Sequence, residues 1–174
     1  LQIILILINA FFASSELAVL SLNENKTRKQ AEDGDKKAAM LLRMVEAPSS
    51  FLSTIQIGIT LAGFLASAFA ASNFAARLSA LLRGWGLTLL SPGALYSVCV
   101  VLITLILSYF TLIFGELVPK RLAMKKAESI ALALSGVISF ISAAFRPIVW
   151  LLTVSTNLVL KLLGVDPNEE DDEL

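Results

Sequence analysis

Histidine is absent from this sequence of 174 residues. Catalytic and structural zinc sites and Ser-His-Asp triads usually depend on histidine, so their usual chemistry is missing. The single cysteine, Cys99, lies in an apolar run, which excludes a disulfide framework and a thiolate metal site within this sequence. No nucleophile is paired with a recognisable base in the remaining sequence. We therefore expect a protein that is not an enzyme.

Charge is also scarce, because only 16% of the residues are charged while 56% are hydrophobic. Soluble domains have an apolar share of about 45–50%, so this composition indicates a membrane protein whose first partner is the lipid bilayer. The net charge is zero, but six of the 14 basic residues lie between Lys26 and Arg43 and four between Lys120 and Lys126. Such clusters beside apolar runs mark cytoplasmic flanks. Neither cluster needs a nucleic acid to explain it.

The apolar runs predict an all-α fold with three transmembrane helices, at about 1–22, 50–72 and 94–115. Each is close to the length of about 20 residues that a membrane crossing needs. The charged stretch 23–50 predicts cytoplasmic helices along the membrane, and 73–93 an outer loop with one amphipathic helix. The basic clusters then place the N-terminus outside and the C-terminus in the cytoplasm of a multi-pass protein of the inner (plasma) membrane.

The last hydrophobic stretch, at about 128–163, is split at Arg146 and Pro147 into two runs of about sixteen residues, each too short for a span. Two arrangements fit: one long kinked span, or two halves lying against the cytoplasmic side as a belt or shallow hairpin. Glu128 and Lys161 at the two ends favour juxtamembrane belt helices. Residues 165–174 are an acidic linker, so we expect the membrane domain, 1–164, to come from a longer protein.

The stretch 114–120 carries the strongest functional signal. Glu116 is one of only two carboxylates inside the apolar segments, where an acidic side chain is costly and usually functional. Pro119 lacks the N–H that would bond the carbonyl of Gly115. A free carbonyl beside a carboxylate suits a hard cation. Two structural explanations stay open: Pro119 could simply end the helix, and Glu116 could pair with Lys120 one turn away.

Polar side chains form stripes on the three predicted helices. On the second helix they fall within about 80° of one another at 3.6 residues per turn: Ser53, Gln56, Thr60 and Ser67, with Gly63 among them. On the third helix the stripe leads to Glu116: Thr104, Ser108, Thr111 and Gly115. On the first helix Asn9 and Glu16 share a face, so we expect a common cavity. Close packing of small residues is the alternative for the second helix, and pairing with the basic segment for Glu16.

Three motifs together resemble the membrane domain of the CNNM/CorC family: Asn-Ala-Phe-Phe-Ala-Ser-Ser-Glu at 9–16, Pro-Ser-Ser-Phe-Leu-Ser-Thr-Ile-Gln-Ile-Gly-Ile-Thr-Leu at 48–61, and Gly-Glu-Leu-Val-Pro-Lys at 115–120. The resemblance covers essentially all of 1–164. It implies a homodimeric magnesium transporter that exports Mg²⁺ in exchange for Na⁺, with three transmembrane helices and a juxtamembrane belt. It also implies cytoplasmic CBS domains and a CorC domain outside this sequence, and ATP is expected only in those CBS domains.

By the same resemblance, Mg²⁺ would lie between the three helices. The candidate ligands are Glu116, Gly115, Ser15, Glu16, Thr60, Ser67 and Asn9. The sequence departs from the family pattern at Ala13, where many relatives have serine, and after Gly58, where relatives often have asparagine. Thr60 and Ser67 could replace those asparagines. The sequence therefore predicts a cation transporter, with export of another cation such as a polyamine, or a non-transporting regulatory membrane module, as alternatives.

Overall fold

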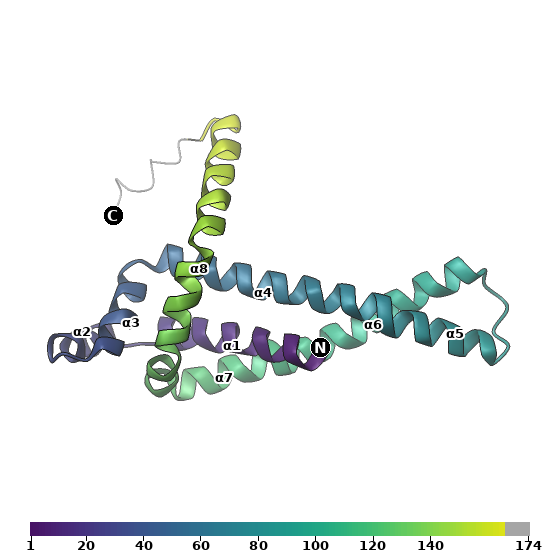
Figure 1. Cartoon of the computed structure of the whole chain (residues 1–174), viewed down its shortest axis with the longest axis horizontal. Coiled ribbons are helices and arrows are strands. Elements are labelled where there is room, and N and C mark those ends of the chain that lie inside the picture. Colours follow the sequence, from purple (N-terminus) through teal and green to yellow (C-terminus); the bar gives the residue numbers. More distant parts are fainter. Residues whose placement is uncertain (166–174) are drawn as a thin grey trace.

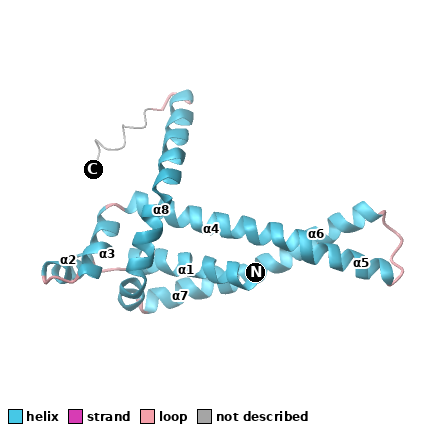
Figure 2. Cartoon of the chain, viewed as in Figure 1, coloured by secondary structure: helices cyan, strands magenta, loops and turns pink. Residues whose placement is uncertain are grey.

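The computed structural model describes residues 1–165, and within this range the chain is helical and has no strand (Figure 2). The all-α prediction is confirmed. The predicted acidic linker falls almost wholly on residues 166–174, which lie outside the described range. The described residues form ten helical elements in this order: α1 (Gln2–Leu20), α2 (Glu24–Glu32), α3 (Lys36–Glu46), α4 (Pro48–Ala70), η1 (Ala71–Ala75), α5 (Ala76–Gly84), α6 (Pro92–Leu112), η2 (Ile113–Leu117), α7 (Val118–Lys125) and α8 (Ala127–Leu162).

Within residues 1–165, four helical segments are long and apolar enough to cross a membrane. They are Gln2–Leu20, Pro48–Gly84, Pro92–Lys125 and Ala127–Leu162. The first lies within the predicted span 1–22, and the second and third contain the predicted spans 50–72 and 94–115. The fourth is the segment for which the sequence left both a kinked span and a juxtamembrane belt open, and its length fits either.

Two of these segments continue through wide, π-helical turns where the sequence predicts an end. α4 runs through η1 into α5, so the connecting loop shrinks from the predicted 73–93 to the stretch between Gly84 and Pro92. α6 runs through η2 into α7, and the N–H of Val118 bonds the carbonyl of Ile113, five residues back. Pro119 follows this turn as the second residue of α7, a position where a missing N–H is tolerated. Pro119 therefore does not end the helix.

α1 lies at the centre of the fold and contacts α4, η2, α7 and α8 (Figure 1). The main core cluster includes Phe12, Val19, Leu41, Ile55 and Ile138, all at most 6% exposed. α1 and α4 approach closely at Gly58, because a Cβ there would lie 2.5 Å from the ring of Phe12. Small residues allow this kind of close helix contact in membrane proteins.

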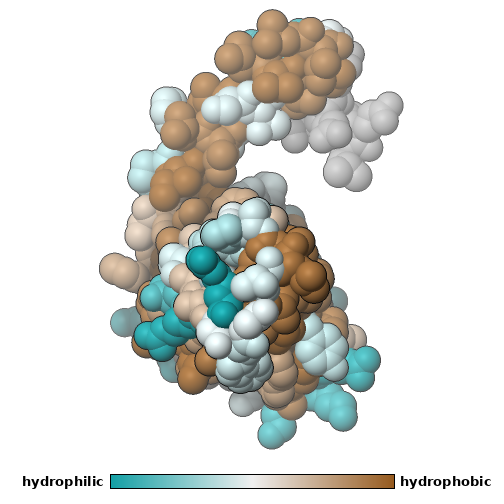
Figure 3. All heavy atoms as spheres, turned by 90° about the vertical axis from the view of Figure 1, so that its right-hand side faces the viewer, coloured by the Kyte–Doolittle hydropathy of each residue, from teal (hydrophilic) through white to brown (hydrophobic). Residues whose placement is uncertain are grey.

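α8 is one continuous helix through Pro147, so the shallow hairpin is wrong. Its first half packs against α1, α3 and α4, and its second half extends away from the bundle (Figure 1). Seen from the α5 end of the molecule, α8 is covered mainly by apolar residues (Figure 3). Glu128 ties the start of α8 to α2, since it accepts hydrogen bonds from Lys26 at 2.6 Å and Gln30 at 2.9 Å.

Candidate functional site

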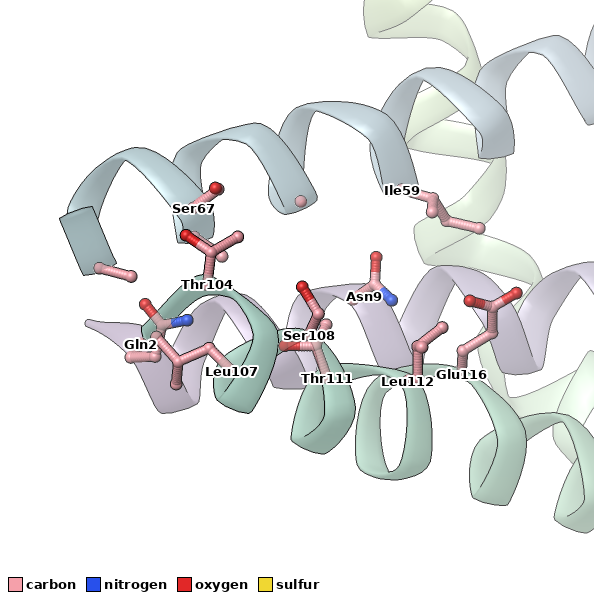
Figure 4. A pocket seen from close by; sticks show the side chains of 13 residues that line it. Gln2, Asn9, Ile59, Ser67, Thr104, Leu107, Ser108, Thr111, Leu112 and Glu116 are labelled. Atoms are coloured by element: carbon pink, nitrogen blue, oxygen red, sulfur yellow. The ribbon is translucent and has the colours of Figure 1, made fainter. Parts of the chain in front are cut away.

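A cavity of about 340 Å³ lies between α1, α4 and α6 (Figure 4). It is elongated, with Gln2, Ser67 and Thr104 near one end and Glu116 at the other (Figure 4). Apolar residues such as Leu107 and Leu112 complete its walls. Seven polar side chains line it: Gln2 and Asn9 from α1, Ser67 from α4, Thr104, Ser108 and Thr111 from α6, and Glu116 from η2. The two predicted stripes on the second and third helices thus meet in part, through Ser67 and the α6 hydroxyls.

The carboxylate of Glu116 is 33% exposed and lies beside Lys120, whose Nζ donates a hydrogen bond to Glu116 Oε1 at 3.1 Å. The same Nζ lies 3.2 Å from Oε2 of Glu16 on α1. Lys120 therefore bridges the two carboxylates of the apolar segments. The pairing of Glu116 with Lys120 that the spacing allowed is present, and Glu116 lines the cavity as well.

The carbonyl of Gly115 is not free, which changes the expected ligand set. The side chain of Asn9 donates from Nδ2 to this oxygen at 3.1 Å. Because a carbonyl only accepts, the amide NH₂ faces Gly115 and the Oδ1 of Asn9 points toward the cavity (Figure 4). A Cβ at position 115 would lie 3.1 Å from Asn9 Nδ2, so glycine leaves the space in which Asn9 reaches the backbone.

The π-helical turn η2 places Gly115 and Glu116 against α1. π-Helical turns within α-helices are frequent at functional sites, because the extra residue changes which side chains face inward. Gly115 is buried against Asn9, while the next residue, Glu116, turns its carboxylate into the cavity. The local backbone thus brings an acceptor and a charge to the same end of the cavity.

The other predicted ligands lie elsewhere. Ser15 is buried and its Oγ donates to the carbonyl of Phe11 at 2.7 Å, so it is used within α1. Thr60 accepts a hydrogen bond from Gln56 at 3.4 Å and does not line this cavity. Glu16 lines a different cavity, beside α8, and is therefore separated from Asn9. Residues seven positions apart in a helix lie on the same face but about 10 Å apart along its axis. Asn9 and Glu16 are separated in this way, and Lys120 contacts Glu16.

The predicted ligand set missed four polar residues that line the cavity: Gln2, Thr104, Ser108 and Thr111. The three hydroxyls belong to the stripe that the sequence shows. Gln2 could have been found from the spacing of Gln2, Asn9 and Glu16, which recur every seventh residue on α1. Gln2 is 9% exposed, and its Oε1 has no hydrogen-bond partner within the described part of the chain. A buried acceptor without a partner is costly, so this oxygen is suited to meet a ligand.

Among residues 1–165, no three histidine, cysteine, aspartate or glutamate side chains come together as a metal cluster. A cation in this cavity would meet one carboxylate, Glu116, and neutral amide and hydroxyl oxygens. This chemistry suits a hard cation that keeps part of its water shell, because Mg²⁺ gives up water reluctantly and is usually bound through one or two carboxylates.

Comparison with known proteins gives one family and a set of bacterial relatives. The family model described as "Cyclin M transmembrane N-terminal domain" (CNNM) matches residues 1–174. A UPF0053 protein of Synechocystis sp. is 36% identical over 166 residues, covering 95% of this chain and 36% of the relative. A polyamine export protein of Haemophilus influenzae is 26% identical over 168 residues, covering 96% and 38%. A UPF0053 inner membrane protein of Escherichia coli is 26% identical over 158 residues, covering 91% and 33%. The chain thus spans about a third of the length of these relatives.

Proposed function

The chain belongs to the CNNM transmembrane-domain family, and from this premise we propose that it is the membrane domain of a transporter whose cation binds in the cavity at Glu116. One observation carries the proposal: a single carboxylate from an apolar segment closes one end of a cavity whose other polar groups are neutral amides and hydroxyls. Ionisable groups in such segments mark ion pathways, since their placement in hydrocarbon is costly.

For the ion itself we propose Mg²⁺, exported in exchange for Na⁺. The cavity, at about 340 Å³, is larger than a bare ion and admits one that keeps several waters. Glu116 supplies the charge and Asn9 Oδ1 a neutral oxygen, while Gly115 becomes available only if Asn9 releases it. Lys120 competes with such a cation for the carboxylate, because its Nζ already donates to Glu116 Oε1.

The setting we propose is a multi-pass protein of the inner membrane, with the orientation that the basic clusters predict. A homodimer, and cytoplasmic CBS and CorC domains elsewhere in the full protein, also remain predictions drawn from the family. Four long apolar helices and the inner-membrane relative support the membrane placement.

A polyamine is the second candidate cargo, and two observations favour it. One relative carries the name polyamine export protein. In addition, the cavity is elongated: Gln2 and Asn9 line it seven residues apart on α1, which corresponds to about 10 Å along the helix. A linear amine could place one ammonium at Glu116 and its methylene chain along Leu107 and Leu112.

The variant Glu116→Gln removes the negative charge of the cavity. Wild-type protein in detergent should unfold at a higher temperature when Mg²⁺ is added, since a ligand that binds only the folded state stabilises it. Glu116→Gln should lose this shift, because the cavity then has no charge. Glu128→Gln is the matched control, a carboxylate at the start of α8 and outside the cavity.

An unchanged Mg²⁺ shift in Glu116→Gln would exclude the cavity as the magnesium site. A shift with a linear triamine and none with Mg²⁺ would select the polyamine. Flux of Mg²⁺ into liposomes that carry the full-length protein tests transport directly, and a flux that ignores an imposed sodium gradient would remove the exchange with Na⁺.

A further inference from the structure

A second cavity, of about 590 Å³, lies between α1, the first turns of α4 and the second half of α8. None of its lining residues belongs to the Glu116 cavity. Its polar side chains come from all three helices: Glu16 from α1, Ser53 and Gln56 from α4, and Thr153, Thr156 and Asn157 from α8. Glu16 is the only charged residue that lines it.

Glu16 is incompletely satisfied where it stands. Its side chain is 23% exposed, and its Oε2 is fully buried without a hydrogen bond from the described residues. The nearest cation is Lys120, whose Nζ lies 3.2 Å from this oxygen and is shared with Glu116. When all three groups are ionised, two carboxylates face one ammonium and the cluster keeps a net charge of −1. A carboxylate with half a counter-charge attracts a further cation.

The polar residues of α8 form a stripe that faces Glu16. Thr153, Thr156 and Asn157 are three and four residues apart, the spacing that places side chains on one face of a helix. The Thr153 hydroxyl donates to the carbonyl of Val149 at 2.9 Å, which leaves its oxygen free to accept. Around this stripe the helix exposes large apolar residues, among them Trp150, Leu151 and Leu158. The three polar side chains line the cavity beside Val149 and Leu152 of the same helix, and Thr153 and Thr156 stay exposed to its open side.

We propose that this cavity is a second cation site, in which Glu16 supplies the charge and the α4 and α8 oxygens hold a hydrated metal cation through its waters. The cavity far exceeds the space of one water, and a single carboxylate with scattered neutral oxygens cannot replace a complete hydration shell. The site rests on the proposed function only in that the ion would be the transported one.

Lys120 links the two sites, because it touches the charged residue of each. When a cation binds Glu16, Lys120 pairs with Glu116 alone. When a cation binds Glu116, Lys120 pairs with Glu16 alone. A cation at one site therefore weakens binding at the other, so at low ion concentration only one site is filled at a time. An ion that passes from one cavity to the other needs the second site to be empty.

The experiment counts bound Mn²⁺, a spectroscopic probe for Mg²⁺, by electron paramagnetic resonance of the full-length protein in detergent. At saturating Mn²⁺ the wild type should bind two ions per chain. Glu16→Gln should bind one, and so should the double variant Thr156→Val/Asn157→Leu, which leaves the Lys120 cluster intact. Ser155→Ala is the matched control, since its hydroxyl lies on the same helix, bonds Leu151 at 2.8 Å and does not line the cavity. It should bind two ions.

The outcomes separate this inference from the proposed function. One bound ion in the wild type, lost in Glu116→Gln and kept in Glu16→Gln, overturns the second site and supports the first. One ion lost in Glu16→Gln and kept in Glu116→Gln does the reverse. Two ions that survive in both Glu16→Gln and the α8 double variant also overturn the second site.

Discussion

At the scale of single residues, the contact between Asn9 and Gly115 joins parts of the chain that are 106 residues apart. It satisfies a carbonyl that Pro119 would otherwise leave unbonded, and it orients the Asn9 oxygen toward the cavity. The same contact therefore stabilises the fold and prepares the site.

We expect Asn9→Leu to lower the free energy of unfolding by about 1–3 kcal/mol, because the Gly115 carbonyl is then buried without a donor. The measurement is denaturant unfolding in detergent, with Ser14→Ala as control. Ser14 lies on the same helix, and its hydroxyl bonds only the carbonyl of Phe11, so little should change. A stability loss of equal size in both variants would contradict a special role for Asn9.

Lys120 Nζ contacts both Glu16 and Glu116, so it competes with a bound cation for either carboxylate. Lys120→Met should therefore tighten Mg²⁺ binding about tenfold, on the order of 1.4 kcal/mol, since a competing positive charge is gone. Without Mg²⁺ the same variant should be less stable, because two carboxylates then face each other unpaired.

Titration calorimetry with Mg²⁺ measures the affinity, and Lys120→Arg and Lys125→Met serve as controls. The arginine variant keeps the charge at position 120, and Lys125 pairs with neither carboxylate. Weaker Mg²⁺ binding by Lys120→Met would mean that the lysine orients Glu116 instead of competing with the ion.

At the scale of elements, the crossing of α1 and α4 depends on Gly58, which faces the ring of Phe12. Gly58→Ala should destabilise the protein by about 1–3 kcal/mol, because a methyl group 2.5 Å from the buried ring forces either the ring or the two helices to shift. Combining it with Phe12→Leu should cost less than the sum of the two changes, since the smaller side chain makes room.

Gly63→Ala is the control on the same helix, because a Cβ there meets no atom within 4 Å. It should be neutral or stabilising, as alanine favours helix over glycine by about 1 kcal/mol. Strictly additive effects of Gly58→Ala and Phe12→Leu in denaturant unfolding would show that the two side chains do not meet.

The sequence predicts the positions of these helices well, because the hydrophobic pattern sets them. It predicts the helix ends poorly, because these depend on details of the backbone. The apolar runs locate α1, α4 and α6, and the stripe of α6 hydroxyls does lead to Glu116. The helix ends are wrong at Gly115 and near Ser72, because a π-helical turn lets a helix continue and leaves no mark in an apolar pattern. Pro147 suggested a break in α8, yet a single missing N–H on an exposed face did not interrupt the helix.

At the scale of the whole molecule, the sequence predicts which types of residue form the candidate site, but it does not predict which of them lie next to one another. Glu116, Asn9 and Ser67 share a cavity as expected. The separation of Glu16 from Asn9 depends on how α8 and α7 pack beside α1, which no local spacing encodes. The bridge from Lys120 to Glu16 likewise joins residues more than 100 positions apart, and only the assembled fold brings them together.

The long segment Pro48–Gly84 sets the dimensions of the molecule. Its 37 residues measure about 55 Å as a helix, whereas the hydrocarbon core of a bilayer is about 30 Å thick. The helix must therefore tilt or reach well past the hydrocarbon. The exposed apolar residues near its end, Trp85, Leu87 and Leu89, fit the interfacial zone or a partner surface.

The lysine between the two carboxylates has a consequence for the unloaded protein. A carrier that has released its cargo must change conformation with its binding groups still in a medium of low dielectric constant, where bare anions are costly. A tethered ammonium accompanies these anions as a permanent counter-ion, so the unloaded cluster carries a net charge of −1 instead of −2. If the domain exports cations as we propose, its return without cargo exposes one uncompensated negative charge to the low-dielectric interior instead of two.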